Sequence, residues 1–156
     1  MQGEIRNSKR IDLDALRSII DSTKLFPSEM LEGMMEPYFS NANSEERWLT
    51  YVHDGNCLGV TYYAPEKMTD GTYNLYLIAV HGDAQGKGVG SALMEKVEEQ
   101  LKATGHRILL VETSGTAFFE MTRSFYDKLG YTREAVIRDF YEAGDDKVVF
   151  WKRLNG

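Results

Sequence analysis

Cysteine is nearly absent from this chain of 156 residues, because Cys57 is its only one. A single cysteine cannot form an intrachain disulfide, so a reducing compartment, the cytoplasm, is expected. No apolar run approaches the roughly 20 residues of a membrane-spanning helix. The polar N-terminal segment MQGEIRNSKR lacks the apolar core of a signal peptide. The sequence therefore predicts a cytoplasmic protein without a membrane partner.

Positive charge is also scarce, with 18 Lys and Arg against 24 Asp and Glu and a net charge of −6. This balance disfavours nucleic-acid binding through phosphate contacts. It is compatible with a cationic amine ligand, although solubility alone would also explain it. The length and the hydrophobic fraction of 42% indicate one globular domain over residues 1–156.

The most informative stretch runs from Asn74 to Leu101. An apolar, aromatic-rich run predicts a strand over residues 72–80. Apolar residues four positions apart then predict an amphipathic helix; they are Val89, Leu93, Val97 and Leu101. Between strand and helix lies the segment QGKGVG, residues 85–90. The stretch is thus a strand, a glycine-rich turn and a helix.

Glycines let a backbone turn sharply and let a ligand approach it, and the first N–H groups of a helix favour phosphate. The segment therefore predicts an anion site, the alternative being a connection that binds nothing. A P-loop is excluded because residues 81 and 88 are His and Gly. A dinucleotide fingerprint is excluded because its third glycine would fall on Ser91 or Leu93.

The segment 85–90 fits Q/R-x-x-G-x-G/A and resembles the acetyl-coenzyme A loop of the GNAT N-acetyltransferase superfamily. A second segment, FYDKLGY at residues 125–131, resembles the superfamily's Y-x-K-x-G-[FY] segment. The resemblance covers roughly residues 51–154. It implies an α/β GNAT fold, with a mixed, mostly antiparallel central sheet flanked by helices. Two parallel strands, 74–80 and 108–113, would splay apart to admit the pantetheine arm.

The resemblance also implies which residues bind acetyl-coenzyme A. Backbone groups at the end of the first parallel strand would hold the pantetheine, and the Val80 N–H would stabilise the oxyanion. Amides of the loop would hold the pyrophosphate, with charge from Lys87. The cofactor-binding residues expected in this way are Ile78, Ala79, Val80, Gln85, Gly86, Lys87, Gly88, Val89, Gly90, Ser91 and Tyr126.

Acetyl transfer to an amine needs a neutral amine and a donor for the leaving thiolate. The superfamily's tyrosine at the place of Tyr126 often donates that proton, although a tyrosine packed against the sheet would look the same. Glu112, near the end of an apolar strand, is the candidate general base. A structural carboxylate or a substrate anchor is the alternative. No metal is implied.

The acceptor pocket is less defined. In the superfamily the segment between the first two helices lines it, which makes Phe26, Met30 and Tyr38 candidate walls; filling the core is the simpler role for most of these side chains. Tyr141 can shape the same pocket. Phe140 and Tyr141 can equally cover a sheet edge or a homodimer contact.

The expected function is acetyl transfer from acetyl-coenzyme A to a primary amine by direct attack in a ternary complex. Two departures from the superfamily pattern favour an alternative, a coenzyme A-binding module without catalysis. Asn74 stands where some members carry a basic carboxylate, and Phe119 stands where an Asn often contacts the cofactor. A nucleotide-binding protein is the third hypothesis. The acceptor, a small amine or a peptide N-terminus, stays open.

Overall fold

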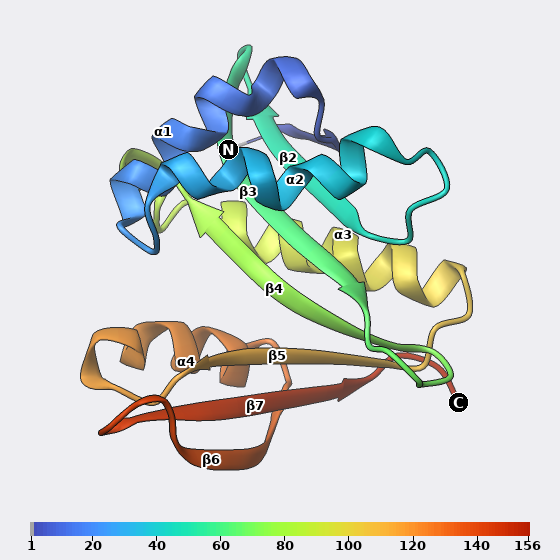
Figure 1. Ribbon diagram of the computed structural model, residues 1–156, viewed down its shortest axis with the longest axis vertical. Helices are drawn as coiled ribbons and strands as arrows, with labels where there is room; N and C mark the ends of the chain where they lie inside the picture. Colours follow the sequence, from blue (N-terminus) through green and yellow to red (C-terminus); the bar gives the residue numbers. More distant parts are fainter. Residues whose placement is uncertain (1) are drawn as a thin grey trace. The chain divides into compact units, whose positions relative to one another are not determined.

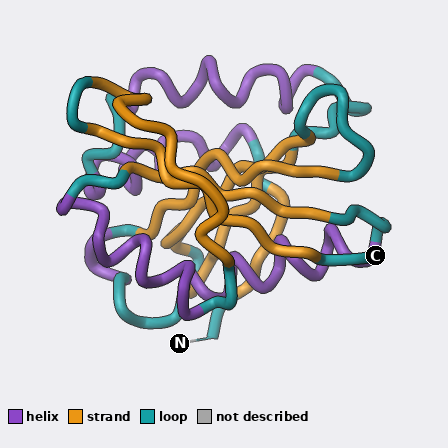
Figure 2. The backbone as a smooth tube through the Cα atoms, turned by 90° about the horizontal axis from the view of Figure 1, so that it is seen from below, coloured by secondary structure: helices purple, strands orange, loops and turns teal. Residues whose placement is uncertain are grey.

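The computed structural model describes residues 2–156, in which helices and strands are mixed along the chain (Figure 1). The strands of this range are β1 (Glu4–Asn7), β2 (Arg47–His53), β3 (Asn56–Pro65), β4 (Thr72–Val80), β5 (Ile108–Ser114), β6 (Thr132–Glu142) and β7 (Asp145–Arg153). The α-helices are α1 (Leu13–Thr23), α2 (Leu31–Ser40), α3 (Val89–Ala103) and α4 (Glu120–Lys128). Loops join them (Figure 2), and four short 3-10 helices lie among these connections in the described residues. No helix of the described residues is long and apolar enough to cross a membrane.

Residues 2–156 form a seven-stranded mixed sheet in the order β1-β2-β3-β4-β5-β7-β6. Strands β4 and β5 run parallel, and their pairing extends from Thr72 opposite Ile108 to Leu75 opposite Val111. The pairs β1–β2, β2–β3, β5–β7 and β6–β7 are antiparallel. The α/β fold with one parallel pair is therefore confirmed. The splay of that pair stays a prediction.

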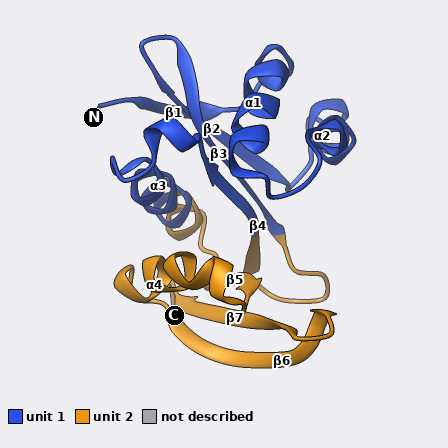
Figure 3. Cartoon of the chain, turned by 90° about the vertical axis from the view of Figure 1, so that its left-hand side faces the viewer, with its two compact units in different colours: residues 1–64, 76–99 blue, residues 65–75, 100–156 orange. Residues whose placement is uncertain are grey.

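Contacts divide the chain into two compact units, residues 1–64 with 76–99 and residues 65–75 with 100–156 (Figure 3). In the first unit, α1 and α2 cover a core around Trp48, which is fully buried. Helix α1 supplies part of this core through its apolar face. Its buried members are Leu16, Ile19, Ile20, Leu31, Met35, Trp48, Val60, Leu77 and Ala79.

Helix α3 packs on β3 through the apolar stripe that the sequence predicted. Val89, Leu93 and Val97 are at most 1% exposed. A Cβ atom at Gly59 would lie 2.8 Å from Cγ1 of Val89 and 3.0 Å from Cδ1 of Leu93, so the close approach of the helix requires glycine there. This contact fixes the start of α3, where the glycine-rich loop enters.

In the second unit, α4 packs against β5 and β7 through Tyr126. The ring of Tyr126 lies 5.3 Å from that of Phe150 and 5.8 Å from that of Tyr131. Leu109 and Val111 of β5 are also buried. One face of this part of the sheet is therefore an apolar core beneath α4.

The residue pattern of the sequence predicts two last strands, over residues 131–137 and 147–153, with a turn at residues 143–146, and the β6–β7 hairpin differs from this pattern. Strand β6 continues to Glu142 because the chain bulges, with Asp146 alone standing opposite residues 138–141. Side chains replace the missing ladder bonds. The Asp139 N–H donates to Asp146 Oδ1 over 2.9 Å, and the Gly144 N–H donates to Asp139 Oδ1 over 3.0 Å.

Candidate functional site

The glycine-rich loop joins β4 to α3 in the first unit and is anchored at both ends. The His81 N–H donates to the Leu58 carbonyl over 2.8 Å. The Gln85 Nε2 donates to the Val80 carbonyl over 3.2 Å, which ties the loop to the strand end. At the other end, the Ala92 N–H donates to the Gly88 carbonyl over 3.0 Å as α3 begins. The loop therefore has a defined shape.

That shape turns backbone toward open space. Gly86 and Gly88 have φ values of +76° and +84°, and a Cβ atom at either position would meet nothing within 4 Å. Residues 85–88 are exposed, and one of them, Lys87, carries a positive charge. The first N–H groups of a helix have no acceptor inside it, and the helix dipole adds positive charge there. An anionic group such as a diphosphate fits this corner.

The two expected catalytic residues both belong to the second unit but lie on opposite faces of β5. Val111 pairs with Phe150, whose ring contacts that of Tyr126. Tyr126 is therefore on the Val111 face. Side chains alternate along a strand, so Glu112 points to the other face. A reaction that uses both residues must therefore receive one of them from each face of the sheet.

Glu112 belongs to a polar and aromatic cluster. Its Oε1 pairs with Lys147 Nζ over 3.1 Å, and that ammonium also lies 4.0 Å from the centre of the Phe140 ring. Burial, and then the carboxylates of Glu112 and Asp145, raise the pKa of the Tyr141 hydroxyl. The structure thus brings Glu112 and Tyr141 together, as an acceptor site formed from both would require.

Tyr126 is 2% exposed and its hydroxyl has no hydrogen-bond partner among the described residues. Burial raises the pKa of this phenol above its ordinary value. The hydroxyl therefore stays protonated at neutral pH and keeps its proton available for a ligand.

Asn74 is buried beside Glu66 in the second unit. Its Nδ2 donates to Glu66 Oε1 over 2.8 Å, while its Oδ1 has no partner among the described residues. The Glu66 N–H donates to the Thr72 carbonyl, which fixes the loop before β4. The Glu66 carboxylate thus lies beside the Asn74 side chain, a place for which the sequence indicated no carboxylate.

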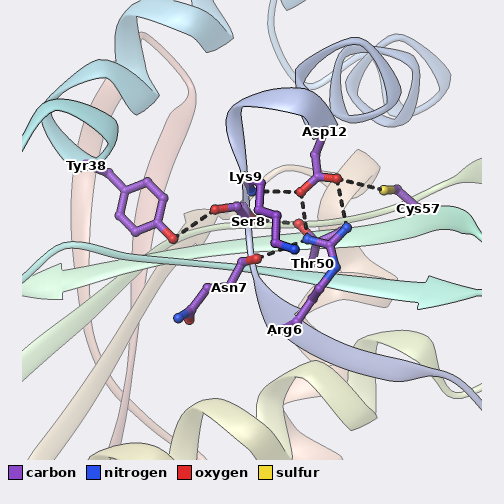
Figure 4. A network of polar contacts seen from close by, with 8 residues as sticks. All are labelled: Arg6, Asn7, Ser8, Lys9, Asp12, Tyr38, Thr50 and Cys57. Atoms are coloured by element: carbon purple, nitrogen blue, oxygen red, sulfur yellow. Dashed lines mark hydrogen bonds and ion pairs between the residues drawn. The ribbon is translucent and has the colours of Figure 1, made fainter. Parts of the chain in front are cut away.

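The candidate acceptor walls of the first unit differ in exposure. Phe26 and Tyr38 pack against the core, whereas Met30 is 55% exposed. The Tyr38 hydroxyl donates to the Ser8 carbonyl over 2.9 Å. It joins a network in which Arg6 pairs with the buried Asp12 over 2.7 Å (Figure 4). Tyr38 is therefore held in place, and a role for these residues in acceptor binding stays a prediction.

Sequence reasoning missed two partners of the site, Lys147 and Glu66. Lys147 alternates with the buried Val148 along β7, which places it on the Glu112 face. The alternation was visible in the sequence, but the register between β5 and β7 was not. Glu66 carried no signal because it lies in a polar connection.

Residues 44–133 match the acetyltransferase (GNAT) domain family. An uncharacterized N-acetyltransferase of Methanocaldococcus jannaschii is 26% identical over 154 residues, which cover 96% of this chain and 90% of that protein. The crystal structure of a proposed GNAT-family acetyltransferase from Desulfovibrio desulfuricans is 31% identical, with a TM-score of 0.92, and the match covers 98% of this chain and 99% of that one.

An aminoglycoside 6'-N-acetyltransferase complexed with coenzyme A shares the fold at 17% identity, with a TM-score of 0.79 and coverage of 98% of both chains. The glycine-rich loop that suits a diphosphate lies within the matched residues. The chain belongs to the GNAT acetyltransferase family.

Proposed function

We propose that this protein is an N-acetyltransferase that moves an acetyl group from acetyl-coenzyme A to a primary amine by direct attack in a ternary complex. The observation that carries the proposal is the exposed, left-handed glycine backbone at the start of α3, in a chain of the GNAT family. Direct transfer needs neither a metal nor a covalent enzyme intermediate.

The donor half of the proposal rests on the first unit. The N–H groups from Gln85 to Ser91 bind the diphosphate, and Lys87 adds charge. Backbone groups of Ile78, Ala79 and Val80 pair with the pantetheine arm, and the Val80 N–H stabilises the oxyanion. Coenzyme A supplies the thioester in this scheme.

The chemical half rests on the second unit. The amine nitrogen attacks the carbonyl carbon, the carbon–sulfur bond breaks, and the Tyr126 hydroxyl protonates the leaving thiolate. Before the attack, Glu112 takes a proton from the substrate ammonium, directly or through water, and after it the Tyr126 oxygen regains a proton from solvent. Support for these roles comes from the protonated, unpartnered Tyr126 hydroxyl and from the Glu112 carboxylate beside Tyr141.

The partner that we propose is a cationic primary amine, either a small molecule or a peptide N-terminus. The net charge of −6 and the carboxylates of Glu66 and Glu112 suit such a ligand. Phe26, Met30, Tyr38 and Tyr141 are its proposed contacts.

Thiol release from acetyl-coenzyme A against a library of amines tests the activity. Turnover on at least one amine supports the proposal. Coenzyme A binding without turnover on any amine would favour the inactive binding module. Thermal stabilisation by ATP but not by acetyl-coenzyme A would favour a nucleotide-binding protein instead.

Two glycine variants test the donor site against a matched control. Gly86 and Gly55 have φ values of +76° and +77°, and neither has an atom within 4 Å of a built Cβ. Gly86→Ala and Gly55→Ala should therefore carry similar backbone strain. We expect Gly86→Ala alone to weaken coenzyme A binding in calorimetry. Equal affinity in the two variants would place the diphosphate elsewhere.

A further inference from the structure

In the second unit, the face of β5 and β7 that lies opposite α4 is only partly covered. On the α4 face, Val111 and Phe150 are at most 1% exposed. Side chains alternate between the two faces of a strand, and those of Leu110, Val149 and Trp151 lie on the other face and are partly exposed. Leu110 pairs directly with Trp151. This face therefore carries an apolar strip that keeps contact with solvent.

Asn74 and Glu112 stand on the same face as this strip. Asn74 lies opposite Leu110 in the parallel pair of β4 and β5, and Glu112 follows Leu110 by two residues. Residues directly opposite each other in a sheet share a face, as do residues two apart along a strand. Regular sheet spacings place the Cα atoms of Asn74 and Glu112 about 8 Å apart. The apolar Leu110 side chain thus adjoins both polar groups.

The Asn74 side chain carries a hydrogen-bond acceptor that no protein group uses. Asn74 is 1% exposed, and its Nδ2 donates to Glu66 Oε1 over 2.8 Å. Because an ionised carboxylate only accepts, this contact fixes the orientation of the amide and leaves Oδ1 for a different donor. Among residues 2–156, that Oδ1 has no hydrogen-bond partner. A buried acceptor without a donor is costly, so this oxygen marks a place that suits an N–H group of a ligand.

The charges around this oxygen favour a cationic donor. Glu66 and Glu112 bring two negative charges to the face, and Lys147, which pairs with Glu112 over 3.1 Å, brings one positive charge. These three groups together leave one negative charge. An ammonium that donates to Asn74 Oδ1 is also attracted by the adjacent Glu66 carboxylate. A water molecule at the same oxygen gains no such attraction.

We propose that Asn74 and Glu66 bind the far ammonium of a short aliphatic diamine, whose near nitrogen is acetylated beside Glu112. The inference rests on the proposed acetyl transfer and names its acceptor class. The methylene chain packs on the apolar Leu110. The far charge also disfavours a second charge on the reacting nitrogen, which lessens the demand on Glu112. A monoamine leaves Asn74 Oδ1 unpaired, so Asn74 and Glu66 determine specificity.

Two acceptors with the same carbon chain test the second contact. Diaminopentane and pentylamine differ by one ammonium group, and we expect the KM for diaminopentane to be at least about tenfold lower in thiol-release assays. Glu66→Gln keeps an oxygen for Asn74 Nδ2 but removes the charge, and Asn74→Leu removes Oδ1. Each should raise the KM for diaminopentane about tenfold and leave turnover of pentylamine unchanged, which also reports intact folding. Asp70→Asn, an exposed position of the same loop, is the matched control and should change neither value.

The outcomes separate this inference from the proposed function. Equal KM values for the two acceptors in the wild-type chain would overturn the inference and leave acetyl transfer standing. Equal losses on both acceptors in Glu66→Gln would make Glu66 a structural residue and would also overturn it. Absence of thiol release with every amine would instead refute the proposed function. Calorimetry of diaminopentane with the coenzyme A-loaded protein then still tests the ammonium site: binding that Glu66→Gln weakens and Asp70→Asn does not supports it, and absence of binding refutes it.

Discussion

Replacing Tyr126 by Phe separates a catalytic hydroxyl from a packed ring. The ring contacts Phe150 at 5.3 Å and Phe125 at 5.2 Å, and Phe can keep both contacts. The hydroxyl has no hydrogen-bond partner among the described residues, so its removal leaves no protein group unpaired. We therefore expect the free energy of unfolding to change by less than about 1 kcal/mol.

The expected effect on catalysis is much larger. General acid catalysis contributes about 10²–10⁴ in rate, which corresponds to about 3–5 kcal/mol of transition-state stabilisation. If Tyr126 protonates the thiolate, kcat should fall by at least about 10²-fold, while the KM for acetyl-coenzyme A changes little. Because burial raises the pKa of this phenol above 10.0, its ionisation should not limit activity between pH 6 and about 9.

The assay pairs thiol-release kinetics with denaturant unfolding on the same variant. Leaving-group dependence gives a second readout. A donor with a more acidic thiol needs less protonation, so the ratio of wild-type to variant rates should shrink for it. Full turnover in Tyr126→Phe, or a fall in rate that merely follows a fall in stability, would refute the acid role.

Three further perturbations have defined outcomes. Asp12→Asn should lower the free energy of unfolding at pH 7 by about 2 kcal/mol, less than for a fully buried pair because Arg6 is 26% exposed. The Arg6 guanidinium holds the pKa of Asp12 below its ordinary value of 3.8. The stability that the pair contributes is therefore present above that pH and is lost as the pH falls through the lowered pKa. Denaturant unfolding should show the wild-type chain to be more stable than Asp12→Asn at pH 7 and only slightly more stable near pH 2. Glu112→Gln should reduce kcat/KM more for an amine of pKa about 10.4 than for one of about 8, in a comparison of two acceptors; equal losses would make Glu112 an anchor rather than a base. Gly59→Ala should cost about 1–3 kcal/mol of stability and shift α3, observed as a lower melting temperature and weaker coenzyme A binding; unchanged binding would uncouple the loop from this contact.

Local periodicity was sufficient for the elements around the glycine-rich loop. The strand over Thr72–Val80 was predicted from an apolar, aromatic-rich run, and the helix from Val89 was predicted from apolar residues four positions apart. The hairpin of β6 and β7 was placed less well. Its bulge depends on Asp139 and Asp146, which bond across the hairpin and supply the bonds that a regular ladder would have supplied. The alternation of apolar and polar residues along either strand does not indicate that side-chain bonds will replace backbone bonds at this point.

The contacts of the candidate site depend on register, which a single sequence does not specify. Glu112 was found as a lone carboxylate in an apolar strand, but its pairing with Lys147 requires that β7 place Val149 opposite Glu112. Likewise, Glu66 reaches Asn74 only because the loop before β4 folds back on Thr72. Residue types indicated the chemistry, and tertiary pairing decided the partners.

The pairing of Glu112 with Lys147 bears on which amines this site can serve. Lys147 occupies Oε1 of the carboxylate, and only Oε2 is without a partner among the described residues. An α-amine of pKa about 8 is already neutral in roughly a tenth of molecules at pH 7, whereas a lysine-type amine of about 10.4 is neutral in about one in 10³–10⁴. With Lys147 on Oε1, a single oxygen of this carboxylate is left to accept a proton, and the first kind of amine makes the smaller demand on it. Lys147→Met removes the ammonium from Glu112, and in a competition assay this variant should acetylate lysine-type acceptors, relative to α-amines, more than the wild-type chain does. An unchanged ratio of the two products would show that Glu112 does not accept the proton.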